Sequence, residues 1–174
     1  MQRTSPEVPR ILVAGIGNIF LADDGFGCEV VRHLGALEAL PGVRVVDYGI
    51  RGMHLAYDLL EGWDLAILVD ALPDRGDPGC LAVLEVSADM TGSAGLDAHG
   101  MDPASVLSSV AALGGELPRT CLVGVQVAEI SERMGLSDRV GAAVVPATTA
   151  VRELVREHLA TSSGSFVQRS ERVG

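Results

Sequence analysis

Apolar residues along the chain alternate between short continuous runs and the spacing of a helix. Between the runs, apolar residues recur every three or four positions, as at Val30, Leu34 and Leu37, and this spacing predicts helices. The runs themselves end at turn residues and are typical of buried strands. They cover 11–16, 43–47, 65–70, 81–86 and 120–127. Nearly all-apolar strands that alternate with helices favour a mostly parallel sheet covered on both faces.

The spacing of the elements identifies one strand that cannot be parallel. Only ten residues, rich in Pro, Gly and Asp, separate Asp70 from Leu81, and a parallel crossover needs about a dozen residues or more. We therefore expect an α/β fold, a three-layer sandwich around a five-stranded twisted sheet that is parallel except for one antiparallel edge strand, 81–86. Helices are expected from Asp24 to Pro41, over 53–60, from 102–103 onward, and over 137–159 with a kink at Pro146.

Length and composition limit the class of protein. The chain has 174 residues, which suits one domain; we expect it over 11–160, after an N-terminal extension 1–10 and before a disordered polar tail 161–174. A net charge of −10 argues against nucleic acid as a partner. No apolar stretch reaches transmembrane length, and the N-terminus lacks a signal peptide's apolar run, so we expect a cytoplasmic monomer with no membrane insertion. Three widely spaced cysteines without a CxxC pair argue against a disulfide framework.

The turn after the first predicted strand combines glycines with two acidic residues. It has the sequence GIGNIFLADDGFG, from Gly15 to Gly27. A dinucleotide-binding turn has a third glycine where this chain has Phe20, and the acidic pair Asp23-Asp24 would repel a pyrophosphate at a helix N-terminus. The turn therefore presents carboxylates to a cation, and a nucleotide-binding module is disfavoured.

Three side chains are candidates for a metal site. Asp24 follows the first predicted strand, Asp70 ends the third, and His99 lies in the loop after the fourth. Ligands of open parallel sheets collect beyond the carboxyl ends of the strands, and two carboxylates with an imidazole suit a divalent metal. Because the fourth strand runs in reverse, its long loop has to bring His99 back to that edge.

Each of these residues also has a purely structural interpretation. Asp24, or Asp23 beside it, could cap the helix that follows. Asp70 could begin an Asx-turn, and His99, between Ala98 and Gly100, could be an exposed loop histidine. The residues alone leave these alternatives open.

Four stretches of the chain resemble one known family. GIGNIFLADDGFG, DYGIRGMHL, a strand ending in LVDA, and AHGMDPASVL are similar to the hydrogenase maturation endopeptidases, which trim the large subunit of nickel–iron hydrogenases. The similarity is collinear from about Ile11 to about Leu159. The segment Asp47 to Gly52 departs from the pattern, since other members more often have Asp-Gly-Gly-Thr there.

The resemblance implies an activity and a site. It implies a metal-dependent endopeptidase that removes a C-terminal extension from a hydrogenase large-subunit precursor after nickel insertion. Two acids and a histidine would bind the metal and carry catalysis, and these correspond to Asp24, Asp70 and His99. The nickel would arrive with the precursor, as a recognition element or also as a Lewis acid; Cd²⁺ or Zn²⁺ could replace it in vitro. The alternative is a non-catalytic α/β protein that binds a metal or a nickel-bearing client, as a maturation chaperone would.

Overall fold

The computed structural model describes residues 8–87 and 102–167, and within them five strands form one sheet. The strands are β1 (Ile11–Ile16), β2 (Val43–Gly49), β3 (Leu65–Leu72), β4 (Leu81–Val86) and β5 (Arg119–Gln126). Their order is β2-β1-β3-β5-β4. The pairs β1–β2, β1–β3 and β3–β5 are parallel, and β4 pairs antiparallel with β5 at the edge. The mostly parallel sheet with one reversed edge strand is confirmed.

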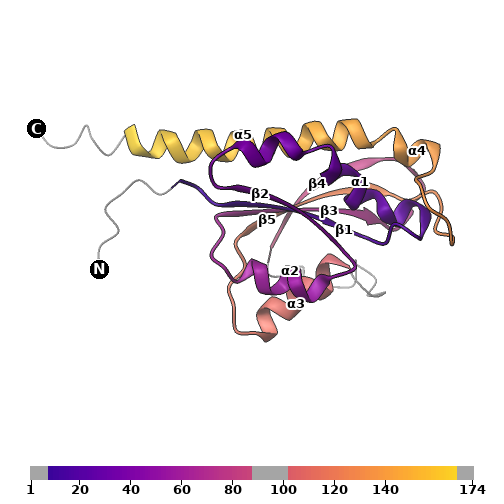
Figure 1. Ribbon diagram of the computed structural model, residues 1–174, viewed down its shortest axis with the longest axis horizontal. Helices are drawn as coiled ribbons and strands as arrows, with labels where there is room; N and C mark the ends of the chain where they lie inside the picture. The colour runs from indigo at the N-terminus through magenta and orange to yellow at the C-terminus, as the bar shows by residue number, and fades with distance from the viewer. Residues whose placement is uncertain (1–7, 88–101, 168–174) are drawn as a thin grey trace, which may run out of the picture.

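Helices cover both faces of this sheet (Figure 1). The short 3₁₀ turns η1 (Ala22–Gly25) and η2 (Gly35–Ala39) flank α1 (Phe26–Arg32). With α4 (Asp138–Gly141) and α5 (Val144–Val167), α1 packs on one face; α2 (Gly52–Leu59) and α3 (Pro103–Ala112) pack on the other.

Alternation along the strands divides the core into two layers. Ile11 and Val13 of β1 pack with α1 and α5, whereas Leu12, Ala14 and Ile16 pack with α2 and α3. This is the period of two that a strand imposes on its side chains. Both faces of β1 are therefore buried, as its nearly all-apolar sequence predicts.

Several boundaries differ from the sequence-based expectation. The expected first helix is interrupted, because α1 ends at Arg32 and a 3₁₀ turn follows. The expected kink at Pro146 is wrong. The break lies between α4 and α5, and Pro146 falls in the first turn of α5, where its missing N–H leaves no bond unmade. Residues 161–167, which the sequence analysis assigns to a disordered tail, are helical as far as Val167.

The N-terminus of α3 forms as its sequence predicts. Asp102 caps it by accepting a 2.6 Å hydrogen bond from the Ser105 N–H, and Pro103 occupies the first helical position. Within the part of the chain that the structure describes, no helix is long and apolar enough to cross a membrane.

Candidate functional site

Glycines bring the turn after β1 close to the sheet. Gly17 has φ +137°, and a Cβ there would lie 1.8 Å from the carbonyl oxygen of Asp24. Its N–H donates to the carbonyl of Gly49 at the end of β2. At Gly27, a Cβ would lie 2.1 Å from the carbonyl of Val69 and 2.3 Å from that of Ile16. The turn and α1 therefore pack directly against backbone, which only glycine permits.

Asp24 is partly buried and is held from within its own turn. One oxygen, Oδ2, accepts a 2.9 Å hydrogen bond from the backbone N–H of Asn18, and the side chain of Asn18 accepts from Phe20 N–H. The N-cap position of α1 is Gly25, and no side chain caps it. The helix-cap interpretation of Asp23 and Asp24 is therefore wrong.

Asp23, the neighbouring acid, is fully buried and is hydrogen-bonded to a distant part of the chain. Its carboxylate accepts hydrogen bonds from the backbone N–H groups of Ala128 (2.9 Å), Glu129 (2.8 Å) and Ser137 (2.7 Å), and from the Ser137 hydroxyl (2.9 Å). Burial by itself raises the pKa of Asp23, but these donors outweigh it and lower the pKa below the ordinary value. Asp23 thus ties the turn to the segment between β5 and α4.

Asp70 is a buried carboxylate inside β3. It is 4% exposed, and its Oδ1 accepts a 2.8 Å hydrogen bond from the N–H of Ala71. The strand continues to Leu72, so Asp70 neither ends the strand nor starts an Asx-turn. Burial raises its pKa well above the ordinary value; the Ala71 N–H opposes that shift, and the charges of Asp24 and Asp102 add to it.

The charges that act on Asp70 come from two other parts of the chain. Asp24 from the turn after β1 and Asp102 from the start of α3 both act on Asp70. Asp102 uses Oδ1 to cap α3, while its Oδ2 is buried without a hydrogen-bond partner. Asp24 follows β1 and Asp70 lies near the carboxyl end of the neighbouring strand β3, so both acids belong to one edge of the sheet; a shared metal site there stays a prediction. His99 lies outside the described residues, so its place in the site stays a prediction.

Cys28 is a buried neighbour of this site that the sequence analysis did not single out. It is 1% exposed, and its Sγ lies 3.5 Å from the carbonyl oxygen of Gly17. Burial raises the pKa of its thiol to about 12, and the nearby carboxylates of Asp47 and Asp70 contribute. The signal was present in the sequence, because Cys28 follows Asp24 by four residues, about one helical turn.

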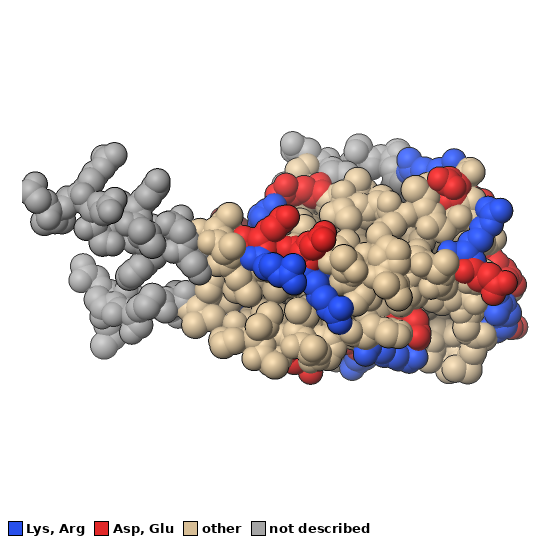
Figure 2. Space-filling view, turned by 90° about the horizontal axis from the view of Figure 1, so that it is seen from above, with Lys and Arg blue, Asp and Glu red and all other residues tan. Residues whose placement is uncertain are grey.

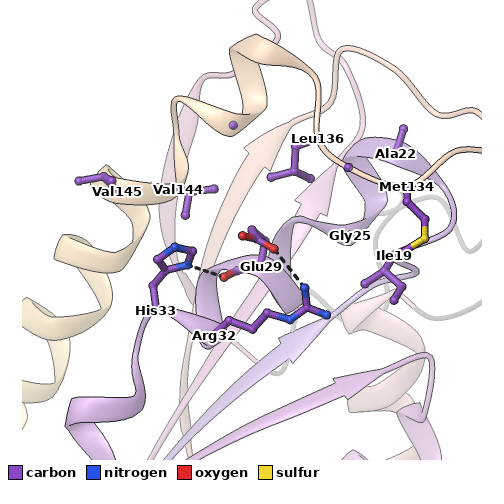
Figure 3. Close-up of a pocket in the computed structure, with 12 residues that line it drawn as sticks. Ile19, Ala22, Gly25, Glu29, Arg32, His33, Met134, Leu136, Val144 and Val145 are labelled. Carbon is purple, nitrogen blue, oxygen red and sulfur yellow. Dashed lines mark hydrogen bonds and ion pairs between the residues drawn. The ribbon is translucent and has the colours of Figure 1, made fainter.

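A pocket of about 550 Å³ lies beside the turn that carries Asp24, on the α1 side (Figure 3). Its walls come from the turn (Ile19, Ala22, Gly25), from α1 (Glu29, Arg32), and from the 134–136 segment with the start of α5. Two of its apolar residues are largely exposed, Met134 at 63% and Val145 at 71%. On the face that carries α5, uncharged side chains occupy a broad area between groups of charged ones (Figure 2).

Comparison with known proteins identifies the family. A family model described as hydrogenase maturation protease (HycI) matches residues 28–154, more than half of the chain. The chain belongs to the hydrogenase maturation protease family. The match includes Asp70 and His99 and begins after Asp24.

Relatives of this maturation protease agree over most of its length. It is 34% identical over 153 residues to the hydrogenase 2 maturation protease of Escherichia coli (strain K12), covering 85% of this chain and 92% of that protein. It is also 34% identical over 154 residues to the hydrogenase expression/formation protein HupD of Rhizobium leguminosarum bv. viciae, covering 86% and 76%. Among solved structures, the hydrogenase maturating endopeptidase HybD from E. coli has a TM-score of 0.71 at 31% identity, covering 86% of this chain and 93% of that one.

Proposed function

We propose that this protease removes the C-terminal extension of a hydrogenase large-subunit precursor after nickel insertion, and that Asp24, Asp70 and His99 recognise the nickel that the precursor carries. The environment of Asp70 supports this proposal most directly. Its buried carboxylate has a raised pKa, and two further carboxylates act on it. Such an arrangement destabilises the charged form unless a cation is present. A divalent ion carried by the substrate would relieve this repulsion.

The chain can bring His99 to the two acids. His99 stands three residues before Asp102, and three residues span at most about 10 Å. Asp102 is close enough to Asp70 to raise the pKa of that carboxyl group. We therefore propose that His99 completes a set of two carboxylates and an imidazole, which suits a borderline divalent metal such as nickel.

The described residues would hold these ligands in place before the substrate arrives. Asp24 and Asp70 each have one carboxylate oxygen held by a backbone N–H, from Asn18 and Ala71. That bond fixes the carboxylate and leaves lone pairs for a metal ion. We propose that the docked nickel places the scissile bond against the site, and that the metal also polarises the peptide carbonyl, as a Lewis acid does.

Mass spectrometry of the precursor tests the proposal. Nickel-loaded and nickel-free precursors are incubated with wild-type protein, Asp70→Asn and the exposed control Asp138→Asn. We expect wild type and the control to shorten only the nickel-loaded precursor, and Asp70→Asn to leave its mass unchanged. An unchanged mass with wild type would favour the alternative, a non-catalytic protein that binds a nickel-bearing client. Equal cutting of both precursors would contradict recognition through nickel.

The proposal also covers the location of the protein in the cell and its oligomeric state. We propose a cytoplasmic monomer with its single α/β domain over residues 11–160. Light scattering during size-exclusion chromatography tests the oligomeric state, and cell fractionation tests the location. A dimer, or a membrane-bound fraction, would contradict this part alone.

A further inference from the structure

The pocket beside the Asp24 turn has the properties of a docking site. Its volume of about 550 Å³ falls within the range of about 300–1,000 Å³ typical of binding pockets. Met134 and Val145 expose most of their surface at its edge, and exposed apolar patches mark interaction sites. The charged residues at its other side, Glu29 and Arg32, form only an exposed 3.3 Å ion pair. Such a pair is weak and can exchange for polar groups of a partner.

The pocket shares the turn after β1 with the candidate site, although neither Asp24 nor Asp70 lines it. Ile19, Ala22 and Gly25 line it, and these residues lie on either side of Asp24 in the same turn. Asp23 ties that turn to Ala128 and Ser137, on either side of the 134–136 wall. A partner seated in the pocket would therefore contact the element that presents Asp24.

An occupant of this pocket has to leave the acids of the candidate site open to the substrate. A second copy seated here would cover the turn that carries Asp24 and would exclude the substrate from the proposed site.

We propose that this pocket receives an apolar segment of the hydrogenase large-subunit precursor, at a distance from the bond that is cut. The proposal rests on the proposed function. It commits to apolar side chains of the precursor packed between Met134 and Val145, with polar groups at the Glu29–Arg32 side. Docking here would position the precursor while its nickel meets the acids on the other side of the same turn.

The test uses Val145→Asp, because an aspartate at position 145 is compatible with folding. Val145 is exposed in the first turn of α5, where an acidic residue is favourable. Leu113→Asp, on the other face of the sheet and also exposed, is the control for an added charge, and its melting temperature is measured too because an acid at a helix C-terminus is unfavourable. We expect Val145→Asp to weaken binding of the nickel-loaded precursor at least tenfold in biolayer interferometry, while its melting temperature and monomeric state stay those of wild type.

Three results would overturn the docking proposal. Val145→Asp could bind and cut the precursor as wild type does, or Leu113→Asp could weaken binding equally. Wild type could also prove to be a dimer that Val145→Asp dissociates, which would make the pocket a self-interface. Failure of the proposed function would look different, because wild type itself would then leave the precursor uncut.

A separate observation concerns the peptide group between Gly17 and Asn18. Its carbonyl oxygen lies 3.5 Å from the Cys28 thiol, and its N–H donates to Asp24 Oδ2 at 2.9 Å. Both ends of one peptide plane are therefore held, one by α1 and the other by the candidate ligand. Gly17 has φ +137°, a region that glycine enters freely, so the backbone alone does not fix the orientation of this plane.

The thiol selects the orientation that suits Asp24. If the plane rotated, the carbonyl oxygen would turn toward the carboxylate and two acceptors would face each other. Because burial raises the pKa of Cys28 to about 12, the group remains an S–H donor at neutral pH. Asp47 is a second hydrogen-bond acceptor for the single S–H proton, and its hydrogen bond also raises the pKa of the thiol.

We infer that Cys28 is a positioning residue, whose S–H holds the Gly17–Asn18 peptide so that its N–H points at Asp24. The readout is hydrogen exchange of the Asn18 amide, measured by NMR on the full chain. Cys28→Val keeps an apolar side chain but removes the donor, and we expect about 3- to 10-fold faster exchange, the effect of one hydrogen bond. Cys28→Ser retains a donor and is expected to restore slow exchange and the turnover number.

The serine variant separates positioning from packing. If Cys28→Val and Cys28→Ser exchange at the same rate as wild type, or lose protection equally, the inference is overturned. In cleavage assays, which rest on the proposed function, Cys28→Val is expected to lower kcat and leave KM unchanged. The exchange measurement does not depend on cleavage, so it holds whether or not the precursor is cut.

Discussion

Asp23 is expected to stabilise the fold more than any surface acid, and Asp23→Asn tests this. In wild type, Oδ2 accepts from Ala128 N–H, Glu129 N–H and the Ser137 hydroxyl, and Oδ1 accepts from Ser137 N–H. An asparagine that keeps its oxygen at the Oδ2 position directs its NH₂ at the Ser137 N–H. One buried donor then lacks a partner, and the other three hydrogen bonds lose the charged acceptor.

The loss in free energy of unfolding caused by Asp23→Asn follows from these hydrogen bonds. An unsatisfied buried donor costs about 1–3 kcal/mol, and a hydrogen bond to a neutral acceptor is worth about half of one to a charged acceptor. Because the neighbouring backbone is partly exposed, water offsets some of this loss. We expect a loss of about 3 kcal/mol, or a melting temperature lower by about 6–12 °C for a chain of this size.

The stabilisation that Asp23 provides should depend on pH in a defined direction. The folded-state pKa of Asp23 is lowered from 3.8, so its stabilisation is fully present above the unfolded pKa and is lost as the pH falls through the folded pKa. Urea unfolding followed by circular dichroism should show a constant difference between wild type and Asp23→Asn from about pH 7 to 5, shrinking below about pH 4. Asp138→Asn, at an exposed position, should stay within about 0.5 kcal/mol of wild type. A difference under about 0.5 kcal/mol for Asp23→Asn at pH 7, or one that grows in acid, would refute the reasoning.

Three further predictions follow from the glycines and the acids. Gly27→Ala should lower the free energy of unfolding by about 3 kcal/mol, since its Cβ would meet the backbone of Val69 and Ile16. Gly35→Ala, with no atom within 4 Å of the added Cβ, should leave the free energy of unfolding unchanged. Equal melting temperatures of the two variants would contradict this. Asp70→Asn should stabilise the protein at neutral pH, because a carboxylate with a raised pKa stabilises the fold below its unfolded pKa and loses that contribution as the pH rises; a stability gain seen only near pH 3 would contradict it. In the metal-free protein, Asp24→Asn should lower the pH at which the Asp70 carboxyl group titrates in carboxyl-detected NMR, because the charge of Asp24 raises the pKa of Asp70; an unchanged titration midpoint would show that the two acids do not interact.

The central strands β1, β3 and β5 were predictable because each is a nearly continuous run of buried, mostly apolar residues. β1 and β4 have the expected bounds, and the reversed strand followed from the ten residues between Asp70 and Leu81. The helix boundaries were less predictable. Apolar spacing continues past Arg32, although the helix gives way to a 3₁₀ turn, and spacing cannot distinguish these two local structures.

The roles of the acids depended on contacts that the sequence does not reveal. Asp23 and Asp24 are adjacent, yet one is bonded to residues more than 100 positions away and the other to Asn18 in its own turn. A carboxylate beside a glycine-rich turn suggests a helix cap, and only the fold shows that neither acid serves as one. The placement of Asp24 and Asp70 at one edge of the sheet was predictable, because the carboxyl ends of neighbouring parallel strands meet there.

The central claim is that Asp24, Asp70 and His99 bind one metal ion together, and calorimetric titration of Ni²⁺ tests it most directly. Wild type, Asp70→Asn and His99→Ala are compared with His54→Ala, which alters an exposed histidine on α2. We predict one site in wild type and in His54→Ala, with affinity at least tenfold weaker in the other two variants. Equal affinity of His99→Ala and wild type would remove His99 from the site and contradict the account.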